Sequence, residues 1–243
     1  GTTGRDDDGN GYADDVYGYN FALGTSRLTW DVEAYDDKGK NVGDSGHGTH
    51  VAGTVAAVSN NGVGVSGIAG GTGRNDGVKL MSCQIFSGGN GGTISTSVRA
   101  IKYAADNGAS IIQCSWGYPA GAVTTDNAYA SGARIEKQAI DYFIATKNNA
   151  VLDGGLVIFA AGNDAKAMSG YPGAYRDYIS VTAFSPDYLP AYYTNYGPGC
   201  NVAAPGGDAY LAFGKQRRAG AFDASVRALP VGLRLYAGYL DGL

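Results

Sequence analysis

Two histidines are the residues whose type and spacing most directly suggest chemistry in this chain. His47 and His50 are the only histidines among 243 residues, and both lie in the segment H-G-T-H-V-A-G-T. An imidazole titrates near neutral pH, so at the start of a helix that faces a cleft it could take a proton from a hydroxyl and return it to a leaving amine. A zinc pair is the alternative, but no third histidine is present and the spacing differs from H-E-x-x-H.

An acidic loop near the start of the sequence is a second candidate site. Its oxygen-bearing side chains follow the order D-x-[DN]-x-[DN]-G, with a glycine for the sharp turn, and they are Asp6, Asp8, Asn10, Asp14 and Asp15. The distal glutamate of such loops is absent, because Tyr17 stands at its position. The pattern predicts a structural calcium ion, while a solvated acidic turn would give the same composition.

Hydrophobic periodicity indicates the elements that must position these residues. A polar loop over 1–20 leads into a short strand that ends at Phe21, and residues 22–45 are expected to cross the surface. Helices are predicted at 48–58, where we expect a buried helix, at 94–107 and at 133–147. Strands are predicted at 78–86, 111–114, 156–161, 178–184 and 200–204. Short apolar strands separated by helices imply βαβ units and a parallel sheet covered on both faces.

Composition narrows the classes of function. The chain is 44% hydrophobic and 16% charged, which is enough to bury the core of one domain, and no linker or internal repeat divides it. A net charge of −4 leaves no broad basic surface, so nucleic acid is not an expected partner. No apolar run approaches the ~18 residues of a membrane helix. The odd count of three cysteines, without paired-ligand spacing, favours buried thiols outside any disulfide or zinc ribbon.

The ordered motifs resemble the subtilase family of serine proteases. The block that begins at His47 is similar to the family's histidine block, and A-A-G-N at 160–163 is similar to its asparagine block. The landmarks Y-P-G at 171–173, T-N-Y-G at 194–197 and A-P-G at 204–206 follow in the family's order, so the likeness covers most of 6–207. It implies an α/β protein with a three-layer α/β/α subtilisin-like fold and a mostly parallel central sheet.

The resemblance also implies roles for individual residues. His47 would be the general base, Asn163 would donate its side-chain amide to the tetrahedral oxyanion, and His50 would pack within its helix. Extended edges of the substrate cleft, which pair with a peptide backbone by β-strand addition, would be formed by Gly91, Gly92, Ser115, Trp116, Gly117, Ala161 and Gly162. No cofactor is required for such chemistry.

Two family blocks have no counterpart in this sequence. The acidic triplet Asp6 to Asp8 lacks the preceding apolar strand that would bury an orienting aspartate beside His47. No G-T-S-M-A string follows the A-P-G landmark, and Ser225, the single serine of 209–243, lacks the flanking small residues. We therefore expect 1–243 to be a single but incomplete peptidase domain, truncated at both ends, with 209–243 of unassigned fold. Without the serine, this chain alone is expected to be inactive.

Three functions remain open on this reading. The first is a serine endopeptidase that uses a Ser/His/Asp triad of which only the histidine is present here, acting on proteins or peptides as a monomer. By family analogy it is expected outside the cell or at the cell surface. The second is an inactive subtilase-like module that binds peptides, although such a module has little use for His47 and Asn163. The third is a purely structural role that depends on calcium in the acidic loop.

Overall fold

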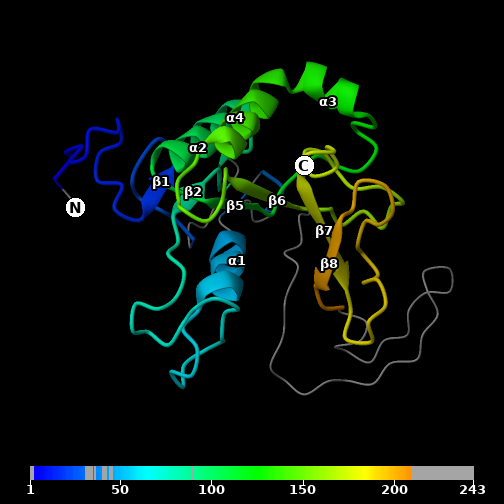
Figure 1. The fold of residues 1–243 in the computed structure, drawn as a ribbon, viewed down its shortest axis with the longest axis horizontal. Helices are drawn as coiled ribbons and strands as arrows, with labels where there is room; N and C mark the ends of the chain where they lie inside the picture. Colours follow the sequence, from blue (N-terminus) through cyan, green and yellow to red (C-terminus); the bar gives the residue numbers. More distant parts are fainter. Residues whose placement is uncertain are drawn as a thin grey trace. The chain divides into compact units, whose positions relative to one another are not determined.

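The computed structural model describes residues 3–30, 35, 37–39, 43, 46–88 and 90–208. The chain forms two compact units, whose helices and strands are labelled in Figure 1. The first unit combines residues 1–110 with 138–156, and the second combines residues 111–137 with 157–243.

The first unit is built from short strands and long helices. Strand β1, Gly18–Asn20, pairs in parallel with β2, Ser82–Gln84, so that Tyr19 lies opposite Cys83. The remaining elements are helix α1 (His47–Ala56), a hairpin of β3 (Phe86–Ser87) with β4 (Asn90–Gly91), and helix α2 (Ile94–Asp106). Figure 1 shows α2 beside β1 and β2.

Helix α2 begins at a side-chain cap and ends in contact with a later segment of the same unit. The Thr93 hydroxyl accepts from the Thr96 backbone N–H at 3.2 Å, which satisfies one of the unpaired donors of the first turn. At the other end, the Asn148 side-chain amide donates to the carbonyls of Ala105 and Ala109 at 2.8 and 2.9 Å. The chain that follows helix α4 (Arg134–Ala145) is thereby held against the end of α2.

An aromatic cluster forms the core of the first unit. Phe21, which is 1% exposed, packs with Ala100 and Tyr103 of α2. Tyr12 meets Phe21 and Tyr103 at ring-centroid distances of 5.6 and 5.0 Å, both in edge-to-face geometry. Such pairs add to the burial of apolar area, so this cluster joins the acidic loop, β1 and α2 into one body.

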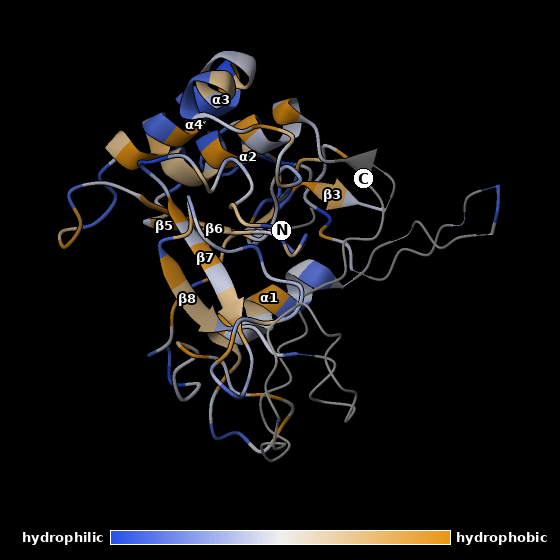
Figure 2. Cartoon of the chain, turned by 90° about the vertical axis from the view of Figure 1, so that its right-hand side faces the viewer, coloured by the Kyte–Doolittle hydropathy of each residue, from blue (hydrophilic) through white to orange (hydrophobic). Residues whose placement is uncertain are grey.

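The second unit contains a four-stranded sheet in the order β5-β6-β7-β8. Strands β6 and β7 run parallel, and so do β7 and β8, with Val181 opposite Val202. The last two strands are mostly apolar (Figure 2). The strand bounds are Ile111–Cys114, Leu156–Ala160, Ile179–Phe184 and Val202–Pro205. These parallel strands, together with the helices, confirm the predicted α/β class.

Buried aromatic rings and one buried carboxylate fill the second unit. Helix α3, Asp126–Gly132, places the fully buried Tyr129 between Tyr171 and Tyr178, with ring centroids 5.3 and 6.4 Å away. Glu136, only 1% exposed, accepts from the Tyr118 hydroxyl at 2.9 Å. A buried carboxylate needs such donors, because it leaves bulk water.

Three element predictions need correction. The strand predicted at 78–86 is reduced to β2, because β1 gives it a partner for only three residues. The helix predicted at 133–147 starts at Arg134, and α3 precedes it because the Thr125 hydroxyl caps that helix by accepting from Ala128 N at 3.1 Å. Helix α1 forms as predicted, but none of its residues is buried. The loop that folds back on it at 66–70 is glycine-rich, and Ile68 there is 86% exposed.

Two expectations from composition can be compared with the structure. None of the helices in the described ranges has the length and apolar character needed to cross a membrane. The three cysteines form no disulfide, and Cys114 is buried while Cys83 and Cys200 are partly buried.

Replacing Phe21 with alanine tests the aromatic core. Removing this ring leaves a cavity between Tyr12 and Tyr103, so Phe21→Ala should lower the free energy of unfolding by about 3–5 kcal/mol in urea denaturation. Tyr17→Ala is the control, because Tyr17 is 77% exposed and its loss should change stability by less than about 0.5 kcal/mol. Equal effects of the two substitutions would contradict the assignment of the core.

Candidate active site

His47 is the first residue of α1, as its place in the motif predicts. Gly46 precedes the helix with φ 69°, a left-handed conformation that glycine adopts at little cost, and its carbonyl accepts from His50 N at 3.0 Å. The His47 side chain is partly buried, and this burial lowers the pKa of the imidazole below its ordinary value of 6.5, with a smaller contribution from the nearby His50. At neutral pH the ring is therefore uncharged and able to accept a proton.

His50 lies one turn further along α1 and serves the helix itself. Its carbonyl accepts from the Thr54 hydroxyl at 3.1 Å, within the same face of the helix. The described residues hold no group of three or more histidine, cysteine, aspartate or glutamate side chains that could bind a metal ion. The pair His47 and His50 thus has no further ligand in that part of the chain.

Asn163 stands in the loop that leaves β6 at the carboxyl end of the sheet. Gly162 before it has φ 107°, and a Cβ there would lie 2.4 Å from Nδ2 of Asn195, so only glycine fits. Ala161 is buried, whereas Asn163 is exposed. Within the described part of the chain no hydrogen bond holds the Asn163 side chain, so its amide is available to a ligand.

Asn195 fixes the backbone of this loop, although the sequence motifs assign it no role. Its Nδ2 donates to the Ala161 carbonyl at 2.9 Å, and its Oδ1 accepts from the N–H groups of Asp164 and Lys166 at 3.0 and 3.1 Å. The side chain is completely buried. The sequence marks Asn195 only as a member of the T-N-Y-G landmark at 194–197. That landmark does not indicate which part of the chain its side chain contacts.

The segment Ser115 to Gly117 runs from the end of β5 beside the same loop. Trp116 packs edge-to-face on Phe159 of β6, with ring centroids 5.5 Å apart. The next residue, Tyr118, donates its N–H to the Tyr171 carbonyl at 2.6 Å, and the neighbouring Gly170 donates its N–H to Ala161 at 2.8 Å. The stretch 170–171 therefore bridges the predicted edge at 115–117 and the predicted edge at 161–162.

Gly117 itself is restricted by this bridge. A Cβ at that position would lie 3.0 Å from the Tyr171 carbonyl oxygen, which is tighter than an ordinary contact. The Ser115 hydroxyl accepts from Gln113 Nε2 at 2.7 Å, so it is engaged by its own strand. Because Gly117 is exposed, its backbone is accessible to an extended peptide.

Gly91 and Gly92 belong to the first unit, in the hairpin after β3. Gly91 pairs with Phe86 in the antiparallel ladder, and Gly92 donates its N–H to the Ile85 carbonyl at 2.9 Å. A Cβ on Gly92, whose φ is 68°, would meet the Phe86 ring at 2.4 Å. The hairpin thus needs glycine at 92 because the Phe86 ring lies close to that backbone. The role of Gly91 and Gly92 in binding substrate stays a prediction.

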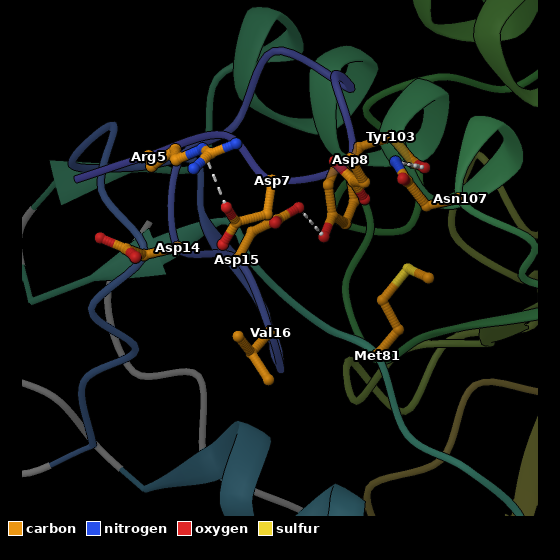
Figure 3. A pocket seen from close by; sticks show the side chains of 9 residues that line it. All are labelled: Arg5, Asp7, Asp8, Asp14, Asp15, Val16, Met81, Tyr103 and Asn107. Atoms are coloured by element: carbon orange, nitrogen blue, oxygen red, sulfur yellow. Dashed lines mark hydrogen bonds and ion pairs between the residues drawn. The ribbon is translucent and has the colours of Figure 1, made fainter. Parts of the chain in front are cut away.

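Backbone N–H donors shape the acidic loop, and its residues Asp8, Asp14 and Asp15 line a pocket together with Tyr103 and Asn107 (Figure 3). Asp6 accepts from the backbone of Gly9 and Gly11 at 2.8 and 2.7 Å, and Asp14 accepts from Gly4 N at 2.7 Å. These bonds lower the pKa values of both carboxyls. The Asn10 amide donates to the carboxylates of two further members of the predicted set, Asp8 and Asp15, at 3.2 and 2.8 Å.

This arrangement does not by itself form a cation site. The Asn10 amide directs its donor side toward the carboxylates of Asp8 and Asp15, where a cation would need free oxygen atoms. Asp15 also accepts from the Tyr103 hydroxyl at 2.6 Å, which ties the loop to α2. Calcium binding stays a prediction.

The residues Asp44 and Ser45 before His47, and Ser225 with the whole of 209–243, lie outside the described residues.

The lowered pKa of His47 predicts how stability depends on pH. Well above pH 6.5 the His47 ring is neutral in both the folded and the unfolded forms, so its titration does not change the free energy of unfolding. As the pH falls through 6.5 toward the lower folded pKa, the unfolded chain takes up the proton first, and the free energy of unfolding decreases. Urea denaturation between about pH 8 and pH 5 should show a smaller acid loss in His47→Gln than in the unchanged protein. Parallel curves for the two proteins would disprove the shift.

Comparisons with known proteins agree with these motifs. The family model described as "Subtilase family" matches residues 18–230. Subtilisin DY from Bacillus licheniformis is 34% identical over 177 residues, which cover 71% of this chain and 56% of that protein. Alkaline elastase YaB from Bacillus sp. (strain YaB) is 31% identical over 198 residues, which cover 78% of this chain and 46% of that protein.

A solved structure supports the fold. A protease from Pseudoalteromonas arctica matches with a TM-score of 0.55 and 30% identity over 76% of this chain and 51% of its own. The chain therefore spans about half the length of each of these three relatives. Since the family model covers most of the sequence and the parallel sheet agrees with a subtilisin-like α/β fold, this chain belongs to the subtilase family.

Proposed function

We propose that the protein is a serine endopeptidase that hydrolyses peptide bonds of proteins, with His47 as its general base and Asn163 as a donor to the oxyanion. The observation that carries this proposal is the conjunction of two features in a subtilase chain. A neutral, partly buried imidazole begins α1, and an exposed amide, with no competing hydrogen bond from the described residues, follows β6. The serine nucleophile and the orienting aspartate of the triad are not assigned to residues of this sequence.

The chemistry of such an enzyme gives each group one task. The serine hydroxyl attacks the scissile carbonyl while the neutral His47 takes its proton, and the imidazolium then returns the proton to the leaving amine. Asn163 donates a hydrogen bond to the oxygen as negative charge develops on it. A donor fixed in advance stabilises the transition state more than one that must reorganise, because no free energy is spent on turning it.

The proposed substrate is an extended protein segment. The exposed backbone of Gly117 and the chain at Ala161 and Gly162 flank the 170–171 stretch in the second unit, and we assign them to binding of peptide backbone by strand addition. Ser115 and Trp116 continue the first of these edges. In the first unit, we assign binding of peptide backbone to Gly91 and Gly92. By analogy with the family, the enzyme acts as a monomer outside the cell or at its surface.

Calcium in the acidic loop is a proposed structural addition that takes no part in the chemistry. Binding there would require Asn10 to turn its amide away from Asp8 and Asp15, which would free both carboxylates to act as ligands. Thermal denaturation with calcium and with a chelator tests this: calcium should raise the melting temperature, and Asp8→Asn should abolish the rise. An unchanged melting temperature would leave the loop as a hydrogen-bonded acidic turn.

Substitution of Asn163 tests the proposed function. In a form of the protein that contains the triad serine and aspartate, Asn163→Ala removes the donor that acts when charge develops. The kcat for peptide hydrolysis should then fall about 10²–10³-fold, the loss known for such a donor in subtilisin, a member of this family, while KM changes little. Asn127→Ala is the matched control, because Asn127 is an exposed residue of α3 in the same unit. An unchanged kcat in Asn163→Ala, or equal losses in both variants, would refute the role.

A further inference from the structure

The side chain of Asn195 satisfies all of its hydrogen-bonding capacity on one short loop. Its Nδ2 donates to the Ala161 carbonyl at 2.9 Å and to Asp164 Oδ2 at 3.2 Å. Its Oδ1 accepts the backbone N–H groups of Asp164 and Lys166 at 3.0 and 3.1 Å. The residue is 0% exposed, so water cannot replace these partners.

The backbone of Asn195 adds to the same restraint. Its N–H donates to the Gly162 carbonyl at 3.0 Å, so one residue binds the loop on both sides of Asn163. Its own carbonyl accepts from the hydroxyls of Thr182 and Thr194. Asn195 is in this way attached to β7, an element of the sheet, and it transmits the position of the sheet to the loop.

A second contact ties the loop to Ala120, three residues after the predicted substrate edge at 115–117. Asp164 Oδ2 accepts the Ala120 N–H at 3.0 Å, and Lys166 Nζ donates to the Ala120 carbonyl at 2.9 Å. Because Asp164 Oδ2 also receives the Asn195 amide, the two contacts share one carboxylate oxygen. A displaced Asn195 would therefore disturb the loop and its bond to the 115–120 segment together.

Asn163 depends on this scaffold for its direction. Its side chain is exposed and has no hydrogen bond among the described residues, so the backbone at 162–164 is what fixes its Cα position and the direction of its Cα–Cβ bond. An oxyanion donor must lie within hydrogen-bonding distance of the developing charge, and a displacement of about 1 Å can cost on the order of 10²-fold in rate.

We propose that Asn195 is a positioning residue that holds the Asn163 amide in the direction required for oxyanion binding. This inference rests on the proposed endopeptidase function. Asn195 does not touch the substrate, and it acts only through the backbone of the loop. It therefore differs from a residue that merely stabilises the fold, because its loss should affect the reaction only while Asn163 is present.

A double-mutant cycle in a form of the protein that contains the triad serine and aspartate tests this dependence. Asn195→Asp keeps the size and the Oδ1 acceptor, but it replaces the donor to Ala161 and Asp164 with an oxygen, so kcat should fall at least tenfold with KM within about twofold. In an Asn163→Ala background the same substitution should lower kcat by less than about twofold. The enzyme concentration used to calculate kcat is measured by active-site titration, so that unfolded protein does not lower the apparent kcat. Independent, multiplying losses would overturn the proposal.

Asn201→Asp is the matched control for the cycle. Asn201 uses its Oδ1 to accept Ser180 N at 2.7 Å, and an aspartate keeps that acceptor while adding the same charge to the same unit. Its kcat should match that of the unchanged protein. A loss as large as that of Asn195→Asp would mean that added charge, and not the lost donor, is responsible, which would also overturn the proposal.

Hydrogen exchange gives a readout that does not require catalysis. Asn195→Ala removes the acceptor of the Asp164 and Lys166 N–H groups, so both amides should exchange at least tenfold faster, while the N–H of Val181 in β7 should not change. If Asn195→Ala does not fold, Asn195→Ser serves the same purpose. Unchanged exchange overturns the proposal. An active-site titration that finds no activity in a form of the protein that contains the triad serine and aspartate refutes the endopeptidase function instead, and exchange still decides whether Asn195 holds the loop.

Discussion

The buried hydrogen bonds of the Asn195 amide are the interactions on which the candidate site most depends. A chain that leaves the end of a parallel strand and turns at once exposes backbone N–H and C=O groups that the sheet no longer pairs. Three of these groups, at Ala161, Asp164 and Lys166, are satisfied by one side chain. Because each unpaired buried group costs about 1–3 kcal/mol, other conformations of the loop that break these hydrogen bonds are higher in free energy. The exposed amide of Asn163, for which we propose a role in oxyanion binding, is then carried by a backbone that these bonds hold in place.

Much of the fold was predictable because local patterns determine it. Apolar runs gave β5, β6 and β7 to within a residue or two, and the helical spacing gave α2 from Ile94 onward. The small residues around His47 predicted the start of α1 correctly. The predicted element boundaries were wrong where a distant strand determines them. The length of β2 is limited by its pairing with β1, and the residues of β2 carry no pattern that indicates this limit.

The site was predictable in its motif residues but not in their supports. His47 and Asn163 follow from the order of short blocks, whereas Asn195 acts on a loop 29–34 residues earlier in the chain. The same holds for Glu136, a charged residue whose burial beneath Tyr118 no helical pattern indicates. The acidic loop shows the opposite case. Its composition predicts a cation site, yet its carboxylates are used by N–H donors of the loop itself, a choice that depends on backbone geometry and not on residue type.

The claim that His47 activates a serine in a peptide-hydrolysing enzyme is tested most directly by labelling with a serine-directed fluorophosphonate. Such reagents react with a serine only when a base removes its proton. The account predicts that a form of the protein that contains the triad serine and aspartate labels on a single serine, and that His47→Ala in that form slows labelling by several orders of magnitude. A protein that binds peptides yet does not label, or one that labels equally fast without His47, would contradict the account.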